Sequence, residues 1–329
     1  MLKSTHRADV VSLDGVTKHP NADKLGVLHI DGYTVVLNLE DWAGKSKAVY
    51  VKPDSLVDTS REEFAWLAKL CPQGQTKYRV TAKRIRGVVS FGLLTPCDES
   101  ATVGDDYAEK LGIEHYEIPD FQGVAGMVPS PRGLFIPKYD LESLRSYQRM
   151  YDGVTHIDIT EKLHGENMRV VCVDGVVYAG SRTNFWEYSS NNPYGFTLLC
   201  SQEVVNFVKQ NERTVVYGES IGGVKGFPYG VAKGQREFRV FDILRENGTK
   251  LRFGELDFVC NEYKMKKVPT IAERFPIDKT KSLVEQLEQL ANGKSNLDAS
   301  HVREGIVISP SEGEAEKLKL IGSDYLMKS

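Results

Sequence analysis

Residues 161–167 read Glu161-Lys162-Leu163-His164-Gly165-Glu166-Asn167. The run follows an apolar-alternating segment that contains Ile157 and Ile159, so Lys162 is predicted to end a strand directly before a glycine turn. Burying an ammonium group costs free energy, and a lysine on a partly buried strand therefore needs a reason. A nucleophilic, uncharged amine is one such reason. A surface lysine beside a turn is the alternative at this point.

A two-residue hairpin signal follows this run. Asp174-Gly175 lies between two apolar segments and is typical of a tight β-hairpin turn. Paired positions in such a hairpin have residue numbers with a constant sum, which places Asn167 opposite Arg182. We therefore expect Lys162, Asn167 and Arg182 to line one patch. An arginine opposite an asparagine fits a phosphate or ribose site, and it also fits a hydrogen-bonded edge pair.

Four later segments combine an apolar strand pattern with charged residues. In the second of them, strand alternation puts Arg239 and Phe241 on one face and Asp242 on the other. Each segment alone is more typical of an ordinary core strand with a charged end. The segments are Val215-Val216-Tyr217-Gly218-Glu219, Phe238-Arg239-Val240-Phe241-Asp242-Ile243, Glu304-Gly305-Ile306-Val307-Ile308 and Lys317-Leu318-Lys319-Leu320.

The bulk composition is that of an ordinary globular protein. The chain has 329 residues, of which 41% are hydrophobic and 26% charged, and this length predicts about two domains. No apolar run approaches the ~20 residues of a membrane span, and the first residues lack the apolar core of a signal peptide. Five cysteines, with no Cys-x-x-Cys spacing, predict a cytoplasmic location or another compartment with reduced thiols.

The sequence pattern changes twice along the chain. Residues 1–97 show short strand patterns and an Asp31-Gly32 hairpin signal, which predict an OB-like β-barrel. Residues 98–135 are punctuated by Pro and Gly and predict a connector. Residues 136–329 mix strand and helix patterns and predict a second, mixed domain. The predicted fold class is therefore α+β.

A basic stretch lies in the predicted barrel. Residues 64–97 contain no Asp or Glu, and we predict one long strand over 78–94 that carries most of the cations. The net charge of the whole chain is −3 at pH 7, so a polyanion site must be a local patch of this kind. The stretch fits a solvated strand face or a weak RNA-binding surface. The cations are Lys77, Arg79, Lys83, Arg84 and Arg86.

Taken together and in this order, the segments from 157 to 320 resemble the six motifs of the covalent nucleotidyltransferases, which comprise DNA ligases, RNA ligases and RNA capping guanylyltransferases. The Lys-x-His-Gly-x-Asn form at Lys162 is similar to the RNA ligase branch typified by bacteriophage T4 RNA ligase 2. DNA ligases and capping enzymes usually have Lys-x-Asp-Gly at this place.

The N-terminal region resembles the OB module of the Naegleria-type RNA ligases. In those enzymes the OB module precedes the nucleotidyltransferase domain and no domain follows it. Ten residues follow Lys319 here, so we expect the same organisation. The resemblance implies a mixed α/β, ATP-grasp-like catalytic domain of antiparallel sheets and helices. It rests on His19-Pro20-Asn21-Ala22-Asp23-Lys24-Leu25, Asp31-Gly32-Tyr33, Val51-Lys52-Pro53-Asp54-Ser55 and Arg84-Ile85-Arg86-Gly87.

The resemblance implies an ATP-dependent RNA ligase that joins a 3′-hydroxyl to a 5′-phosphate. Lys162 would attack the α-phosphate of ATP to give lysyl-AMP, and AMP would then pass to the RNA 5′ end. The implied partners are RNA ends or nicks, with Mg²⁺ or Mn²⁺ as the metal. We expect a monomer.

The same resemblance implies a role for each motif residue. Glu219 and Glu304 would hold the metal, and Lys317 and Lys319 would grip the α-phosphate. With the metal, these lysines would lower the pKa of Lys162. The remaining nucleotide-binding residues are Phe241 and Val307 on the two faces of adenine, Glu161 at its amino group, and His164, Gly165, Asn167 and Arg182 near the phosphates, the sugar or the RNA end.

His164 departs from the Naegleria type, which has Asp at this position. An imidazole would be a neutral partner there, so it stays open whether His164 replaces the metal contact that the Asp helps to make. Asp242 follows the stacking Phe241, and its opposite alternation predicts that it orients its neighbours.

Two alternatives to an RNA ligase remain at this stage. A capping-type guanylyltransferase or a DNA ligase would share most of the motifs. A non-catalytic RNA-binding protein is the alternative from another class, because the His-Pro-Asn-Ala-Asp run also occurs in tRNA-binding OB modules.

Overall fold

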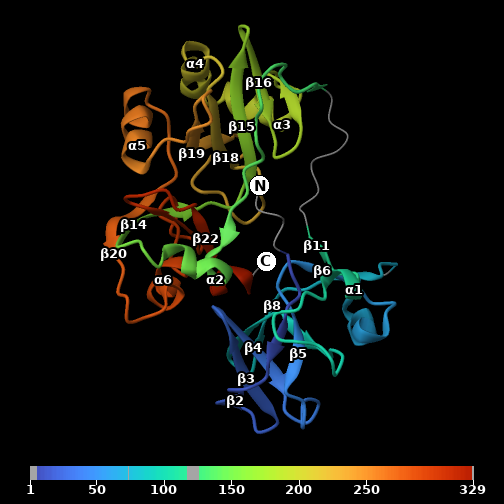
Figure 1. Cartoon of the computed structure of the whole chain (residues 1–329). Coiled ribbons are helices and arrows are strands. Elements are labelled where there is room, and N and C mark those ends of the chain that lie inside the picture. The colour runs from blue at the N-terminus through green and yellow to red at the C-terminus, as the bar shows by residue number, and fades with distance from the viewer. Residues whose placement is uncertain (1–5, 73, 117–125, 328–329) are drawn as a thin grey trace. The chain divides into compact units, whose positions relative to one another are not determined.

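The computed structural model describes residues 6–72, 74–116 and 126–327. The chain forms two compact units, one of residues 1–118 with 326–329 and one of residues 119–325 (Figure 1). No helix in the described ranges has both the length and the apolar character needed to cross a bilayer.

The first unit is built from short strands. β3 (Leu25–Ile30) and β4 (Tyr33–Asn38) form the hairpin that Asp31-Gly32 predicts, with Ile30 paired with Tyr33. The strands group as β1-β5-β10, β11-β6-β7, β2-β3-β4 and β8-β9. The other strands are β1 (Val10–Ser12), β2 (Thr17–Lys18), β5 (Lys47–Val51), β6 (Ser55–Asp58), β7 (Lys77–Arg79), β8 (Ala82–Ile85), β9 (Val88–Phe91), β10 (Leu93–Thr95) and β11 (Glu114–His115).

The segment that follows the barrel strands packs into the same unit. Tyr107, Leu111 and Ile113 are buried in one cluster with Val57 of β6 and Phe64 of the 3-10 helix η1 (Glu62–Leu70). Leu111 ends the short helix α1 (Ala108–Leu111). Residues 98–116, predicted as the start of a connector, therefore share an apolar core with the strands. Residues 117–125 of the predicted connector lie outside the described residues.

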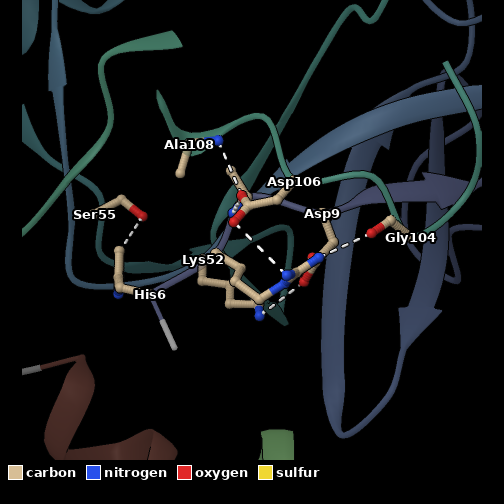
Figure 2. Close-up of polar contacts among 9 residues, drawn as sticks. His6, Asp9, Lys52, Ser55, Gly104, Asp106 and Ala108 are labelled. Carbon is tan, nitrogen blue, oxygen red and sulfur yellow. Dashed lines mark hydrogen bonds and ion pairs between the residues drawn. The ribbon is translucent and has the colours of Figure 1, made fainter. Parts of the chain in front are cut away.

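Polar contacts fix this segment against the beginning of the described chain (Figure 2). The Asp106 carboxylate accepts hydrogen bonds from the backbone N–H groups of Ala8 and Ala108, at 3.1 and 3.0 Å. Asp9 pairs with Lys52 at 3.1 Å. The contacts join the residues before β1, the residue after β5 and the segment around residue 106, and they explain why these residues form one compact unit.

The prediction of one long strand over 78–94 is wrong, because this stretch contains turns. Arg86 and Gly87 have positive φ angles of 48° and 97°, and they turn β8 back onto β9, where Ile85 pairs with Val88. Gly92 has a φ of 83°, and a Cβ there would lie 2.3 Å from a backbone oxygen of β5. The close approach of β5 therefore requires a glycine at this break.

The second unit contains two sheets (Figure 1). The six-stranded sheet has the order β12 (Met127–Val128), β17 (Phe185–Glu187), β16 (Val176–Gly180), β15 (Glu166–Val173), β18 (Val215–Ile221), β19 (Glu237–Leu244). The five-stranded sheet has the order β13 (Glu142–Ser143), β22 (Leu318–Ile321), β21 (Gly305–Pro310), β14 (His156–Lys162), β20 (Thr270–Pro276). Residues 161–167 pass from the end of β14 to the start of β15, and so they connect the two sheets.

Helices cover each of these sheets and complete the predicted α+β architecture. The core of the six-stranded sheet includes apolar residues of α3 (Pro193–Leu199), α4 (Gln202–Gln210) and α5 (Phe253–Glu262). The core of the five-stranded sheet includes residues of α2 (Leu144–Tyr147) and α6 (Leu283–Ala291). The 3-10 helix η2 (Gln148–Tyr151) follows α2, and α7 (Ser323–Leu326) follows β22.

The β15–β16 hairpin has the predicted register but is shorter than predicted. Arg169 pairs with Gly180, which keeps the constant sum that the turn dictates. The ladder ends at Gly180, before Arg182, and Asn167 instead pairs with Glu219 on β18. The turn prediction is therefore correct, whereas the predicted Asn167–Arg182 pair is not part of the sheet.

Candidate active site

Lys162 ends β14 at the junction of the two sheets. Ile157 and Ile159 of the same strand are fully buried, and Lys162 lies opposite Gly305 of β21. The ammonium group donates a 2.7 Å hydrogen bond to Glu304 Oε1. The Lys162 side chain is 24% exposed and that of Glu304 is 12% exposed. The pair is therefore largely shielded from water, although a ligand can still reach it.

Glu219 supplies a second carboxylate from the other sheet. It lies on β18 opposite Asn167 of β15, and its charge acts directly on Lys162. Burial, offset in part by the charge of Lys162, raises the pKa of Glu219 to about 8. Carboxylates perturbed in this way, beside a specific charged partner, are typical of functional sites.

The two carboxylates also set the protonation of Lys162. Burial lowers the pKa of Lys162, but the charges of Glu304 and Glu219 and the hydrogen bond to Glu304 outweigh it and raise the pKa above its usual value. The lower pKa of Lys162 that we predicted from Lys317, Lys319 and a bound metal applies to the metal-bound site and stays a prediction. Lys317 is paired with Asp242, at 3.0 Å. Attack by the amine therefore requires another positive charge to engage the two carboxylates.

Two glycines allow the strands to approach closely around this group. A Cβ at Gly165 would lie 2.4 Å from the Ser220 backbone oxygen and 2.9 Å from Glu219 Cγ. A Cβ at Gly305 would lie 2.2 Å from the Leu320 backbone oxygen. Real Cβ atoms do not come this close to backbone oxygens, so both positions require glycine. The glycines that follow Lys162 and Glu304 in the sequence are thus explained by packing.

A buried network holds Lys317, which directly precedes β22. Asp242 of β19 is fully buried, and its Oδ2 lies 3.0 Å from Lys317 Nζ. The same oxygen accepts a 2.6 Å hydrogen bond from the Tyr139 hydroxyl. Burial and the charge of Asp242 raise the pKa of Tyr139 well above its usual value, so the hydroxyl remains a donor. Asp242 contacts Tyr139, as Phe241 does, so the predicted placement of Asp242 on the opposite face is wrong, and its orienting role stays a prediction.

Phe241 and Val307 come from the two different sheets. The ladder between β18 and β19 shifts at Tyr217, which makes Phe241 the extra residue of a β-bulge. Its half-buried ring packs against Tyr139, with the ring centroids 4.8 Å apart. Val307 lies on β21, opposite Lys319 of β22.

Glu161 presents a buried oxygen with no partner. The residue is 1% exposed, and its Oε2 accepts a 2.8 Å hydrogen bond from the backbone N–H of Asn296. Its Oε1 is buried and has no hydrogen-bond partner among the described residues. An unsatisfied buried acceptor is costly, so this oxygen fits a donor group of a ligand.

His164 lies in a cluster of aromatic rings. Its backbone N–H donates to the Tyr229 hydroxyl at 2.7 Å. Its Nδ1 lies 2.9 Å from the Tyr325 hydroxyl and 3.9 Å from Glu304 Oε2. Burial lowers the pKa of His164 below its usual value, so the imidazole is neutral at pH 7.

Arg182 is placed in the loop after β16, where Asp140 is its acidic partner at 2.8 Å. The neighbouring Tyr139, together with Tyr229 and Tyr325, was missed by the sequence analysis. Each of these three hydroxyls contacts a predicted site residue or its backbone. No spacing or motif separates them from the other tyrosines of the chain.

The predicted RNA-binding cations of the first unit differ in their partners. Lys77 pairs with Glu114 at 2.6 Å, and Arg79 pairs with Asp54 at 2.7 Å. Lys83 lies over the Tyr78 ring, 5.3 Å from its centroid. The other two cations, Arg84 and Arg86, are on β8 and in the β8–β9 turn.

The His19-Pro20-Asn21 run holds this basic hairpin. His19 is buried, and its Nε2 lies 3.1 Å from the Ile85 backbone oxygen. The Asn21 side-chain amide donates to the Arg86 backbone oxygen at 3.0 Å. The backbone N–H of Asn21 donates to His19 Nδ1 at 3.0 Å, so Nε2 is the donor in the neutral ring. Two N-terminal motifs of the sequence therefore meet at one turn.

Comparison with known proteins identifies the family. A family model described as RNA ligase matches residues 155–321, which is more than half of the chain, and a model of an OB-fold domain matches residues 8–97. The chain belongs to the RNA ligase family. The search of curated protein sequences found no match for the ligase.

Solved structures of Naegleria gruberi RNA ligase are similar to this ligase over nearly the whole length of both chains. A mutant with ATP and Mn is 24% identical, with a TM-score of 0.82, covering 98% of this chain and 99% of that chain. A mutant with AMP and Mn has the same identity, TM-score and coverage. A further mutant, solved apo, is 25% identical with a TM-score of 0.82 and covers 98% of both chains. The predicted order of an OB module followed by a nucleotidyltransferase domain is confirmed.

Proposed function

We propose that this ligase uses ATP to join an RNA 3′-hydroxyl to a 5′-phosphate through lysyl-AMP on Lys162. The observation that carries the proposal is the position of Lys162 Nζ, 2.7 Å from Glu304 and within the field of Glu219, at the junction of two sheets. Similar Naegleria gruberi structures contain ATP or AMP with Mn, which supports the choice of nucleotide and metal.

Three transfers at phosphorus make up the reaction. Lys162 Nζ forms a bond to the α-phosphorus of ATP while the bond to pyrophosphate breaks. The AMP then moves from Nζ to an oxygen of the RNA 5′-phosphate, which regenerates the amine. Finally the RNA 3′-oxygen forms a bond to that 5′-phosphorus, and AMP leaves. The covalent step divides one difficult condensation into easier ones.

The nucleotide site combines residues of both sheets. Phe241 and Val307 would enclose the adenine, and Glu161 Oε1 would accept a hydrogen bond from its amino group, which satisfies the unpaired buried oxygen. Lys317 and Lys319 would bind the α-phosphate and stabilise the charge that develops on it. The residues assigned to the sugar, the phosphates or the RNA end are His164, Gly165, Asn167 and Arg182.

The carboxylates fit a hydrated divalent cation. Among the described residues, no group of three or more His, Cys, Asp and Glu side chains is arranged to hold a metal. Glu219 and Glu304 form a two-carboxylate set, which suits Mg²⁺ or Mn²⁺ that keeps several waters. The bound cation would neutralise both carboxylates and so lower the pKa of Lys162. The neutral His164 adds no charge to this set.

We propose that the basic hairpin β8–β9 contributes to RNA binding. Lys83, Arg84 and Arg86 are the cations of this hairpin, whereas Lys77 and Arg79 lie on β7. Phosphate contacts by Lys and Arg supply sequence-independent affinity. Such a surface suits a ligase that must accept RNA ends of many sequences.

We also propose that the enzyme acts as a monomer in a reducing compartment such as the cytoplasm. All five cysteines are free, and two of them, Cys172 and Cys260, are buried. Buried thiols that make no disulfide are compatible with a reducing environment.

The test of this function is transfer of label from ATP radiolabelled at the α-phosphate. The wild-type chain should acquire acid-labile label in the presence of Mn²⁺ or Mg²⁺, and Lys162→Ala should acquire none. Lys209→Ala is the matched control, because Lys209 is an exposed lysine of α4 in the same unit. Label on the Lys162→Ala chain would disprove the mechanism. Label from GTP but not ATP would assign a capping-type guanylyltransferase instead.

A further inference from the structure

Tyr139 is joined to two functional elements although it lies outside every predicted motif. It precedes β13, and residue 139 is also outside the range that the RNA ligase family model matches. Its side chain is 8% exposed. Its hydroxyl contacts Asp242, and its ring contacts Phe241. The contact with Asp242 concerns the proposed phosphate site, and the contact with Phe241 concerns the proposed adenine site.

The hydroxyl shares one carboxylate oxygen with Lys317. Asp242 Oδ2 lies 2.6 Å from the Tyr139 hydroxyl and 3.0 Å from Lys317 Nζ. Asp242 is fully buried, so water cannot replace a missing donor. If the hydroxyl were removed, the carboxylate would depend more on the Lys317 ammonium. Lys317 would then be less available to a phosphate.

The ring supports Phe241 from the side of the bulge. The Tyr139 and Phe241 centroids are 4.8 Å apart, and the rings are tilted by 53°. Because the bulge removes Phe241 from regular pairing with β18, side-chain packing has a larger part in fixing its orientation. Loss of the Tyr139 ring would therefore leave Phe241 with more rotamer freedom.

The segment that carries Tyr139 is itself fixed to the six-stranded sheet. The Tyr217 hydroxyl donates to the Pro137 backbone oxygen at 2.9 Å, and Arg169 Nη1 donates to the Ile136 backbone oxygen at 2.9 Å. The Tyr217 ring packs against the Tyr139 ring, with centroids 5.0 Å apart. Tyr217 is therefore a buried tyrosine of the same cluster whose hydroxyl bonds to the backbone and not to Asp242.

We propose that Tyr139 is a positioning residue for nucleotidyl transfer, with its hydroxyl limiting the hold of Asp242 on Lys317 and its ring setting Phe241 for the nucleotide base. This inference rests on the proposed function, because it assumes that Lys317 binds the phosphate and Phe241 the adenine. It extends that function because the Tyr139 hydroxyl would affect phosphate binding by Lys317, whereas the Tyr139 ring would affect binding of the base by Phe241.

The experiment is single-turnover formation of lysyl-AMP, measured over a range of ATP concentrations. Tyr139→Phe keeps the ring and should lower the maximal rate by about 10- to 100-fold, with the half-saturating ATP concentration changed less than about 3-fold. Tyr139→Leu removes the ring as well and should also raise the half-saturating concentration, by about 10-fold. Tyr178→Phe, at a tyrosine of β16 that packs against the same apolar cluster, is the matched control and should leave both parameters within about 2-fold of wild type.

A double-mutant cycle distinguishes this role from a general loss of structure. If the hydroxyl acts through Lys317, adding Tyr139→Phe to Lys317→Met should cause less than about a 3-fold further loss of rate. Additive losses, or equal losses in Tyr139→Phe and Tyr178→Phe, would overturn the inference while the proposed function stands. A wild-type chain that forms no lysyl-AMP would instead overturn the proposed function itself.

Discussion

The predicted catalytic lysines of the second unit and the predicted RNA-binding cations of the first unit have different surroundings. In the catalytic unit, the side chains of Lys162 and Lys317 are only 24% and 20% exposed, and each lies within 3.0 Å of a carboxylate that is largely or fully buried. In the first unit, Lys77 and Arg79 are 50% and 46% exposed, and their acidic partners are equally exposed.

The difference in exposure separates the ion pairs that we assign to catalysis from those that we assign to RNA binding. Removing one member of a buried pair leaves an uncompensated charge and has a large effect, whereas an exposed pair contributes at most about 1 kcal/mol. The catalytic unit therefore contains buried ion pairs that are costly to form. Their lysines can exchange the carboxylate partner for a nucleotide phosphate. The exposed cations of the first unit adjust affinity for a polyanion and tolerate substitution.

The largest effect is expected from the carboxylates around Lys162. Glu304→Gln and Glu219→Gln keep the side-chain shape but remove the charge that would bind the metal, and each should slow lysyl-AMP formation by about 10²- to 10³-fold. Both variants should also need more Mn²⁺ for half-maximal rate. Glu312→Gln is the control, because Glu312 is 76% exposed and pairs with the exposed Arg274.

If Glu304→Gln formed lysyl-AMP at a rate within about 2-fold of wild type, the buried pairs of the catalytic unit would be no more important for catalysis than the exposed pairs. Such a rate would show that the 2.7 Å contact with Lys162 has no part in the first transfer.

The next effect concerns the packing that brings the carboxylates together. Gly165→Ala places a methyl group 2.4 Å from the Ser220 backbone oxygen and should lower the free energy of unfolding of the catalytic unit by about 1–3 kcal/mol. Denaturant unfolding followed by circular dichroism measures the change. Gly254→Ala is the matched control, because nothing lies within 4 Å of the new methyl group on α5. Equal stability of Gly165→Ala and Gly254→Ala would contradict the close-approach argument.

A smaller and more selective effect is expected from the basic hairpin. Substituting both Arg84 and Arg86 with Gln should reduce sealing of nicked RNA by about 10-fold and lower the salt dependence of RNA binding by about two charges. Lysyl-AMP formation should stay within about 2-fold, because the first transfer does not involve RNA. Substituting Lys77 and Arg79 with Gln should have a weaker effect, since both lie on β7, outside the hairpin.

Lys69→Gln, an exposed lysine at the end of η1, serves as the control for that experiment. If the Arg84 and Arg86 substitutions slow lysyl-AMP formation as much as sealing, the hairpin supports the fold or the nucleotide site and does not act on RNA.

The sequence predicts well what depends on local pattern. Asp31-Gly32 and Asp174-Gly175 each define a hairpin whose register the structure reproduces. The alternation holds for Phe238 and Val240, which share one core cluster, but the bulge at Phe241 interrupts it and turns Asp242 to the same face as Phe241, so that part of the prediction is wrong. The catalytic domain was identified by the resemblance of the motifs and their order to a known family, and the match to the RNA ligase family model confirms it.

Contacts between distant segments could not be predicted in this way. Tyr139 reaches Asp242 across 103 positions, and Tyr325 reaches His164 across 161. Tertiary packing alone determines such pairs. The long strand expected over 78–94 failed for a different reason, because Arg86-Gly87 is a turn signal that the apolar pattern around it obscured.

The central claim is that Lys162 carries the AMP, and peptide mapping tests it most directly. The wild-type chain would be incubated with ATP and Mn²⁺, digested at neutral or alkaline pH to protect the acid-labile bond, and analysed by mass spectrometry. We predict AMP on the peptide that contains Lys162 and its release when pyrophosphate is added before digestion. AMP on a different lysine, such as Lys317, or no AMP on any peptide would contradict the account.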